Sequence, residues 1–321
     1  MNVFSFYTRV YDGVHKRYSK YRLFNSLCRL VIRHLANIHI RLLYGGKKYP
    51  NLYSPHRESG ERIIISLTSF PARINTIWIV ILSLFYQTVK PDKIILWLSK
   101  KQFNDENDIP SNLKNLQNDV FEIRFVEEDY RSHKKYYYSF GQFPNEVIIT
   151  VDDDVIYNPK MIESLVRDAE LYPGAIIANN TNIIVFDNQG KVTPYENWRC
   201  NTVSGLSNSD LLQVGIGGVL YPPHSLYRDV LNPQIFLRVT PLADDIWLNT
   251  MARLNDTKIV QSSNYVLVLP VIIKSNQSLT SINNALGKNN EQIDSIRRYY
   301  LDNLGIDPYG KDEKKITNLS K

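Results

Sequence analysis

The chain of 321 residues is long enough for one large domain or for one domain with extensions. With 43% hydrophobic and 22% charged residues it should form a sizeable core, and its two distant cysteines exclude a disulfide framework and a cysteine-rich zinc site. The net charge of +6 is uneven, because residues 1–50 carry +9 and the rest of the chain therefore carries −3. A net acidic body is unsuited to binding nucleic acid, which needs clustered basic charge.

Residues 21–44 are predicted to form an amphipathic helix. Apolar side chains recur at intervals of three and four residues, at Phe24, Leu27, Val31, Leu35, Ile38 and Leu42. Arg22, Arg29 and Arg33 fall on the opposite face, so the helix could bind an anionic membrane surface or pack on its own domain. Arginines interrupt every long apolar run, and no secretory signal is recognisable. We expect a cytoplasmic enzyme, peripheral at the inner face of the cell membrane.

Three parts are predicted along the chain. Residues 1–60 form the basic helical arm and a polar, turn-rich linker that begins at position 45. Residues 61–285 form the catalytic domain, and residues 286–321 form a polar C-terminal tail with one helical segment. No internal repeat is visible.

Strands and helices alternate from residue 62 onwards. Residues 62–68 are a short apolar run suited to a buried strand, and residues 93–99, 121–127 and 147–151 are predicted to form further strands, each followed by a turn or a helix. This alternation predicts an α/β fold with a mostly parallel, Rossmann-like central sheet and flanking helices. Further strands are expected at 175–199 and 258–273, with a helix opening near 244. Ligands of such sheets bind at the carboxyl ends of the strands.

Three aspartates interrupt the apolar stretch NEVIITVDDDVIYNP at the end of the fourth strand. Adjacent like charges repel one another, so a compensating cation is expected beside Asp152, Asp153 and Asp154. Mg²⁺ and Mn²⁺ prefer oxygen ligands and usually bind through one or two carboxylates together with substrate phosphates. The alternative is a solvated acidic turn.

A second acidic pair, Asp244 and Asp245, opens the later helix. It could supply a general base for a reaction that deprotonates a hydroxyl, or it could simply favour the positive end of the helix dipole. The glycines at 215–218 suit either a close backbone approach or a bulge. Lys134 and Lys135 could reach a phosphate or lie on the wet face of a helix.

Several motifs together resemble bacterial glycosyltransferases of the type A fold, in particular those of capsular polysaccharide and lipopolysaccharide synthesis. The resemblance covers roughly residues 62–275, and the motifs are IIISLTSFPARI, WLS, RSHKKYYYSF, ITVDDDVIY, GIGGVLYPP and LADDIWLN. The short acidic triplet alone is a weak signal. Its position after the fourth strand, with a later acidic pair at the start of a helix, is more specific.

The resemblance implies roles for particular residues. The metal-binding DxD motif falls on Asp152 and Asp154, and Mn²⁺ or Mg²⁺ is the implied cofactor. The nucleotide-sugar would contact Thr68, Ser69, Arg73, Lys134, Lys135, Asp152 and Asp153. Asp245 would be the base on the acceptor hydroxyl, with Asp244 beside it. Many members have Glu where this chain has Asp244, and no histidine follows His224 to act as a late metal ligand.

The sequence thus predicts a metal-dependent transferase that moves a sugar from a nucleotide-sugar donor to a hydroxyl of a glycan or lipid-linked acceptor, with inversion. Two alternatives remain open. A nucleotidyl- or phosphotransferase would share the metal carboxylates and the nucleotide pocket. A non-catalytic scaffold at a membrane surface would tolerate substitution of the acidic residues and would bind no nucleotide.

Overall fold

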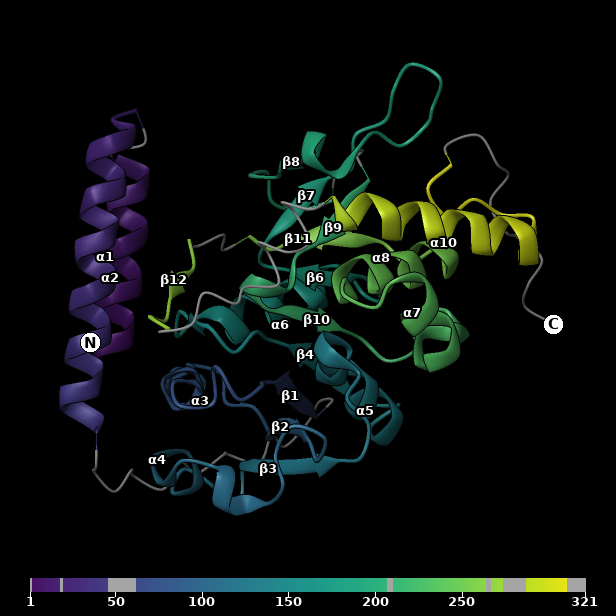
Figure 1. Cartoon of the computed structure of the whole chain (residues 1–321). Helices are drawn as coiled ribbons and strands as arrows, with labels where there is room; N and C mark the ends of the chain where they lie inside the picture. Colours follow the sequence, from purple (N-terminus) through teal and green to yellow (C-terminus); the bar gives the residue numbers. More distant parts are fainter. Residues whose placement is uncertain are drawn as a thin grey trace.

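The computed structural model describes residues 2–17, 20–45, 62–206, 210–263, 267–273 and 287–310. Its centre is a seven-stranded sheet with helices on both faces (Figure 1). In spatial order the strands are β11 (Ile259–Gln261), β6 (Ile176–Ala178), β10 (Val219–Tyr221), β4 (Val147–Thr150), β1 (Ile63–Thr68), β2 (Lys93–Ser99) and β3 (Phe121–Val126).

The predicted α/β fold with a mostly parallel sheet is confirmed. The four strands expected from the first half of the chain form one parallel block, β4-β1-β2-β3. Alternate residues of β1 enter cores on opposite faces of the sheet: Ile63 and Ile65 on one, Ile64 on the other. A strand buried on both faces must be largely apolar, which is why β1, β2 and β4 are mostly hydrophobic. β3, at the edge of the sheet, alternates apolar and charged residues and is only partly buried.

β10 is antiparallel to both of its neighbours, β4 and β6. It comes from the apolar half of the glycine-rich stretch at 215–223, which the sequence did not identify as a strand. Smaller ladders flank the sheet. They are formed by β7 (Thr181–Ile183) with β8 (Arg199–Cys200) and β9 (Leu211–Gln213), and by β5 (Val155–Ile156) with β12 (Leu269–Pro270).

The helices cover the two faces of the sheet. They are α3 (Ile77–Phe85), α4 (Ser111–Lys114), α5 (Lys134–Gln142), α6 (Met161–Leu171), α7 (Pro233–Val239), α8 (Asp244–Leu254) and α10 (Lys288–Leu304). α10, predicted as the helix of the C-terminal tail, packs on α7 and α8 and buries Ile293, Ile296 and Tyr300. The boundaries proposed for the three parts of the chain stay a prediction.

The N-terminal arm is a helical hairpin of α1 (Val3–Arg17) and α2 (Arg22–Tyr44) that stands beside the body, near β12 (Figure 1). α2 confirms the helix predicted at 21–44, whereas α1 was not predicted. The predicted linker lies, apart from Gly45, outside the described residues. In the part of the chain that the structure describes, no helix is both long and apolar enough to cross a membrane.

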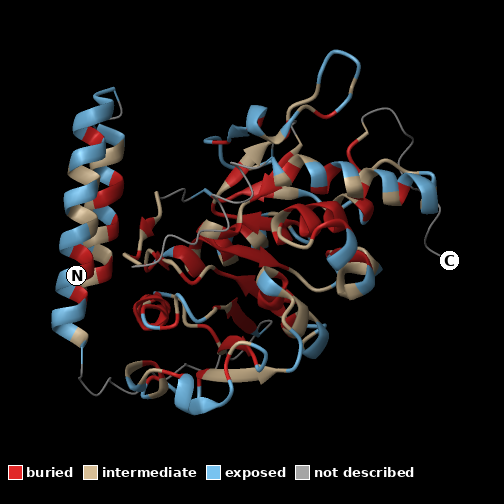
Figure 2. Cartoon of the chain, in the orientation of Figure 1, coloured by how far each residue is buried: buried red, intermediate tan, exposed pale blue. Residues whose placement is uncertain are grey.

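α2 packs on the body through the face opposite to its apolar stripe. Ala36, Asn37 and Ile40 are buried, while Leu27 and Leu42 on the stripe are 59% and 75% exposed. Figure 2 shows the outward side of the hairpin largely exposed. The helix therefore does dock on its own domain, as one of the two alternatives expected, but not by the side chains of the apolar stripe.

Candidate functional site

The two acidic segments singled out in the sequence meet at one place. Asp152–Asp154 follow β4 after one residue, at the carboxyl edge of the sheet, and Asp244 and Asp245 are the first two residues of α8. One side chain, Lys135 on α5, lies between them. Its Nζ is 3.0 Å from Asp152 Oδ1, 2.7 Å from Asp244 Oδ2 and 3.9 Å from Asp245 Oδ1.

Lys135 is held in this position from both ends. Its backbone carbonyl accepts a hydrogen bond from the hydroxyl of Ser66 in the middle of β1, and its side chain is 7% exposed. Burial alone would lower the pKa of the ammonium, because it disfavours the charged form. The carboxylates of Asp152, Asp244 and Asp245 outweigh burial and hold the pKa of Lys135 well above its usual value. Lys135 is therefore a permanent cation at the centre of the cluster.

A second cation, Arg73, pairs with the other two aspartates of the triplet. Its Nη1 is 2.5 Å from Asp153 Oδ1 and 3.0 Å from Asp154 Oδ2. Asp153 is buried and also accepts a hydrogen bond of 2.6 Å from the hydroxyl of Ser69. Asp153 and Ser69 thus fix the turn after β4 against the turn after β1.

The nucleotide-contacting roles expected for the first-strand edge are not tested by these contacts and stay predictions. The hydroxyl of Thr68 donates to the carbonyl of Trp97, 2.8 Å away, and so ties β1 to β2. Arg73 lies with its guanidinium 5.4 Å from the ring centroid of Phe70. Lys134 pairs with Asp129, and its charge also interacts with that of Asp153. Of the two lysines expected to reach a phosphate, only Lys135 lies among the carboxylates.

Three carboxylates of the cluster remain accessible to a ligand. The side chains of Asp152, Asp154 and Asp245 are each 28–30% exposed. Burial and the neighbouring charge of Asp152 raise the pKa of Asp154 to about 6, although Arg73 acts in the opposite direction. The five carboxylates face two cations, so the cluster keeps an excess of negative charge.

This excess charge is compatible with a divalent cation. Among the residues that the structure describes, no group of three or more His, Cys, Asp or Glu side chains could hold a metal ion by itself. A Mg²⁺ or Mn²⁺ ion needs only one or two carboxylates when phosphate oxygens complete its shell. Asp152 and Asp154 fit that role, each with one oxygen paired to Lys135 or Arg73 and part of the side chain exposed.

Asp245 combines the properties of a general base. Burial and the charges of Asp244 and Asp152 raise the pKa of Asp245 to about 7, against the opposing effect of Lys135. The raised pKa places its proton exchange near neutral pH, where a general base is most effective. Its Oδ2 accepts a hydrogen bond of 3.1 Å from the backbone N–H of Gly215, which fixes the orientation of the carboxylate. Asp244 differs, because Lys135 lowers its pKa in spite of burial.

Gly215 is a glycine because the cluster lies against it. A Cβ at this position would lie 2.8 Å from Lys135 Nζ, 3.0 Å from Asp245 Oδ1 and 3.4 Å from Asp152 Oδ1. Contacts of 3.0 Å or less are not tolerated without a shift of the neighbouring atoms. The glycines at 215–218 were expected to allow either a close approach to the backbone or a bulge. At Gly215 the close approach applies, and the groups that approach the backbone are the side chains of the charged cluster. Gly218 differs, since its φ of 89° is a conformation that favours glycine.

The hydrogen bonds of His133 and His224 do not involve the aspartates of the cluster. His133 is fully buried, and its Nε2 lies 2.6 Å from the carbonyl oxygen of Thr240. Burial lowers the pKa of His133 to about 4, so its ring is neutral. It stacks on Phe236 at 4.5 Å between ring centroids and serves the packing of α5 against α7. His224 lies in a turn with a φ of 59°.

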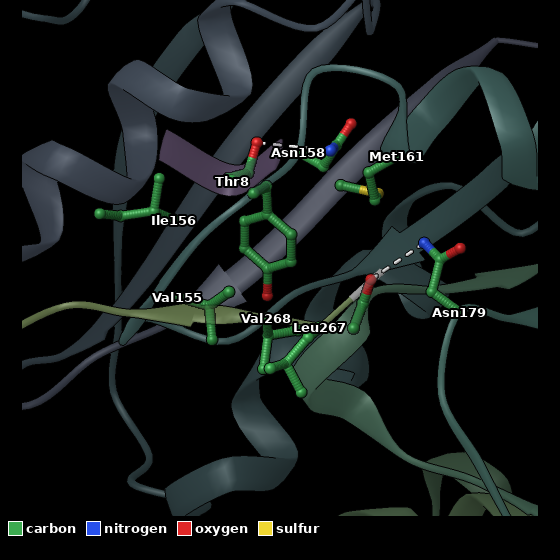
Figure 3. Close-up of a pocket in the computed structure, with 10 residues that line it drawn as sticks. Thr8, Val155, Ile156, Asn158, Met161, Asn179, Leu267 and Val268 are labelled. Atoms are coloured by element: carbon green, nitrogen blue, oxygen red, sulfur yellow. Dashed lines mark hydrogen bonds between the residues drawn. The ribbon is translucent and has the colours of Figure 1, made fainter. Parts of the chain in front are cut away.

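The carboxylates of the cluster line neither of two cavities in the described part of the chain. The first, of about 20 Å³, has room for about one water molecule and is lined by Thr8 of the arm together with Asn158, Met161 and Asn179 (Figure 3). Asn158 Nδ2 donates to Thr8 Oγ1 there, at 3.3 Å, so this cavity marks the contact between α1 and the body. The second, of about 150 Å³, includes Ile148 near the start of β4 and so lies toward the opposite edge of the sheet.

Comparison with solved structures finds proteins whose fold is similar to that of this chain. No protein family matches the chain, and no curated protein is similar to it. Staphylococcus aureus TarS 1–349 in complex with UDP-GlcNAc has a TM-score of 0.46 and 12% identity, over 74% of this chain and 72% of that one. The 4-diphosphocytidyl-2C-methyl-D-erythritol synthase of Anaerococcus prevotii has a TM-score of 0.41 and 14% identity, over 70% and 96%.

A third solved structure, HddC from Yersinia pseudotuberculosis, has a TM-score of 0.33 and 12% identity, over 51% of this chain and 77% of that one. Likenesses at this level concern the fold and not the reaction. The glycosyltransferase resemblance seen in the sequence motifs therefore stays a prediction.

Proposed function

We propose that the chain is a glycosyltransferase that uses a nucleotide-sugar donor, with the Lys135 cluster as its active site. The observation that carries the proposal is the meeting of Asp152 with Asp244 and Asp245 around one buried ammonium, while Asp154, two residues after Asp152, is held by Arg73. The arrangement offers partly exposed carboxylates at the strand edge, where α/β sheets bind ligands, beside a carboxylate with a pKa of about 7. These are the two components that sugar transfer to a hydroxyl requires.

In the proposed reaction the acceptor hydroxyl oxygen attacks the anomeric carbon of the donor sugar. Asp245 takes the hydroxyl proton, a new C–O bond forms, and the bond between the anomeric carbon and the diphosphate oxygen breaks with its electrons on the leaving diphosphate. In-line attack gives inversion. Asp244 and Asp152 are positioned by Lys135, and Asp153 is held by Arg73 and Ser69.

A divalent cation would be held by Asp152 and Asp154. When bound, Mn²⁺ or Mg²⁺ neutralises charge that develops on the departing diphosphate. The ammonium of Lys135 and the guanidinium of Arg73 stay paired with the carboxylates and limit their mutual repulsion. The acceptor would be a glycan or lipid-linked saccharide of surface-polysaccharide synthesis, reached by an enzyme peripheral at the inner face of the cell membrane.

The first experiment is a thermal-shift screen against UDP-, GDP-, dTDP- and CMP-sugars, with and without Mn²⁺. A ligand that binds only the folded state raises its apparent stability by mass action. Stabilisation by one nucleotide class, strengthened by the metal, supports the proposal and identifies the donor class. Absence of any shift at millimolar ligand contradicts it and favours the non-catalytic scaffold.

Nucleotidyl transfer is distinguished by its products. A nucleotidyltransferase would bind a nucleoside triphosphate and a sugar phosphate and release pyrophosphate, whereas the proposed enzyme releases a nucleoside diphosphate, or CMP from a CMP-sugar. Pyrophosphate release from a nucleoside triphosphate and a sugar phosphate, without turnover of any nucleotide-sugar, would replace the glycosyltransferase proposal by that alternative.

A further inference from the structure

The outer face of α2 carries an apolar stripe that nothing in the described chain covers. We define the stripe as Leu27, Val31, Leu35, Ile38 and Leu42, whose side chains are 49–75% exposed. They recur at three- and four-residue spacing, so they form one ridge about 23 Å long at 1.5 Å per residue. A continuous exposed apolar surface of this kind marks an interaction site.

The orientation of the stripe is fixed by polar contacts on the other side of the helix. Arg33 Nη2 donates to the carbonyl of Val271 at 3.0 Å, and Asn37 Oδ1 accepts from the N–H of Ile272 at 2.9 Å. Asn37 Nδ2 also donates to the carbonyl of Pro270, at 3.3 Å. The stripe is therefore held outward while the arm stays on the body. Arg33, one of the arginines predicted on the face opposite to the stripe, thus binds the protein.

The charge of the hairpin indicates what covers the stripe. The hairpin carries exposed cations at Arg9, Lys16, Lys20, Arg22 and Arg41, of which Arg41 also donates to the carbonyl of Ile272. The one acid in residues 1–50 is Asp12, which is buried, accepts from the N–H of Leu267 and pairs with Lys16. A second copy of the chain would bring two segments of +9 against each other, and like charges oppose that contact. An anionic surface is attracted instead.

We infer that the α1–α2 hairpin binds the interface of an anionic lipid bilayer, with the stripe inserted among the acyl chains and the cations at the headgroups. Such helices lie in the plane of the interface and combine buried apolar area with attraction to anionic lipid. The hairpin is also joined to the active site, because Val271, which accepts from Arg33, donates its N–H to the carbonyl of Asp154 at 2.8 Å. Bilayer binding would hold the carboxylate cluster near lipid-linked acceptors.

The inference rests on the proposed function only for the identity of the acceptor. Lipid binding can be measured without turnover, so failure of one proposal is distinguishable from failure of the other. The probe is a set of vesicles of phosphatidylcholine with and without phosphatidylglycerol, sedimented with the full chain. We expect binding to the anionic vesicles at least about tenfold stronger than to the neutral ones, and weaker with added salt.

The stripe is tested by the double variant Leu27→Glu/Leu35→Glu, which should lose at least about tenfold in vesicle binding because charge is costly among acyl chains. The matched control is Leu171→Glu/Leu301→Glu, which replaces two leucines that are 66% and 48% exposed on α6 and α10. The control should bind as the wild type does. The variant Arg9→Gln/Lys20→Gln should bind more weakly and with a smaller dependence on salt.

Two results would overturn the inference. One is wild-type protein that does not sediment with anionic vesicles, or a stripe variant that sediments as well as the control. The other is a wild-type dimer, detected by light scattering, that the stripe variant converts to a monomer while neither protein binds vesicles. That second outcome would assign the stripe to a second copy of the chain.

Discussion

Nζ of Lys135 lies 2.7 Å from Oδ2 of Asp244, so the second residue of α5 is tied to the first residue of α8. The same ammonium lies 3.0 Å from Asp152, shortly after β4. One buried cation thus joins three elements that are far apart in the sequence. It also brings the donor side of the proposed site, at Asp152, next to the acceptor side, at Asp245.

Replacing Lys135 by methionine should destabilise the fold, because it leaves three carboxylates without their shared counter-charge. Removing one partner of a buried ion pair costs about 3–5 kcal/mol, and we expect a loss of that order in the free energy of unfolding at pH 7.5. The loss should shrink as the pH falls, because the unpaired carboxylates acquire raised pKa values and their protonation removes the repulsion. Urea unfolding at pH 7.5 and pH 5.5 measures both effects.

The control for this variant is Lys101→Met, which breaks the pair of Lys101 with Glu128, where both side chains are more than half exposed. Exposed pairs contribute little to stability. Two results would contradict the central role of the ammonium. One is that Lys135→Met is no more destabilising than Lys101→Met, and the other is that the loss in free energy of unfolding caused by Lys135→Met does not change with pH.

Asp245→Asn should abolish most of the activity and leave the fold intact. The amide keeps an oxygen for the N–H of Gly215 but cannot take a proton, so kcat should fall by on the order of 10²–10⁴. Steady-state rates with the donor class found by thermal shift measure the effect, and the melting temperature reports the fold. Asp294→Asn on α10, at an exposed side chain, is the matched control. Unchanged kcat would exclude Asp245 as the base.

The pH dependence of the wild type should report the same carboxylate. Because the pKa of Asp245 is raised to about 7, the base is protonated and inactive below that pH and ionised above it. We expect kcat/KM to rise with pH and to reach half of its plateau near pH 7. A profile that is flat between pH 5.5 and pH 8.5 would show that no group with this pKa limits the reaction.

How far the sequence predicted this site depends on the kind of contact. The four parallel strands and the acidic ends of β4 and α8 were predictable, because apolar runs and strand–helix alternation are local signals. The position of Lys135 was not, since HKKYYYSF contains two adjacent lysines and only packing against β1 decides which enters the cluster. Lys134 pairs with Asp129 instead.

Other contacts of the site could not be predicted from the neighbouring residues in the sequence. Gln213 donates to the backbone carbonyl of Asp245 at 3.1 Å, and the hydroxyl of Tyr157 accepts from the N–H of Asp152 at 2.7 Å. Gln213 stands in no recognisable motif, and Tyr157, although it ends the motif ITVDDDVIY, had no role assigned to it from the sequence. The arm shows a similar limit: the period of α2 was visible, but the docking face was set by Asn37 and Arg33, whose partners lie more than 230 residues away.

Removal of divalent metal tests the role of Asp154. The chelator EDTA should suppress turnover by the wild type, and Mn²⁺ should restore it, because the cluster has more carboxylates than cations. Asp154→Asn should need at least about tenfold more Mn²⁺ for half-maximal rate, since it removes one of the two expected ligands. Asp119→Asn, just before β3 at the opposite edge of the sheet, should behave as the wild type. Full turnover in EDTA would show instead that Arg73 and Lys135 supply enough positive charge.

Gly215→Ala tests the close approach of the cluster to the backbone. The added Cβ would lie 2.8 Å from Lys135 Nζ, and the ammonium cannot withdraw without lengthening its contacts with Asp152 and Asp244. We expect kcat to fall by about tenfold or more, as small displacements of positioned groups are costly in catalysis. Gly13→Ala is the matched control, because its Cβ would meet nothing within 4 Å and alanine favours the interior of α1. The control should keep full activity with equal or higher stability. A Gly215→Ala enzyme with the same kcat would mean that the Lys135 ammonium is free to move. The contacts of this ammonium with Asp152 and Asp244 would then not be required during turnover.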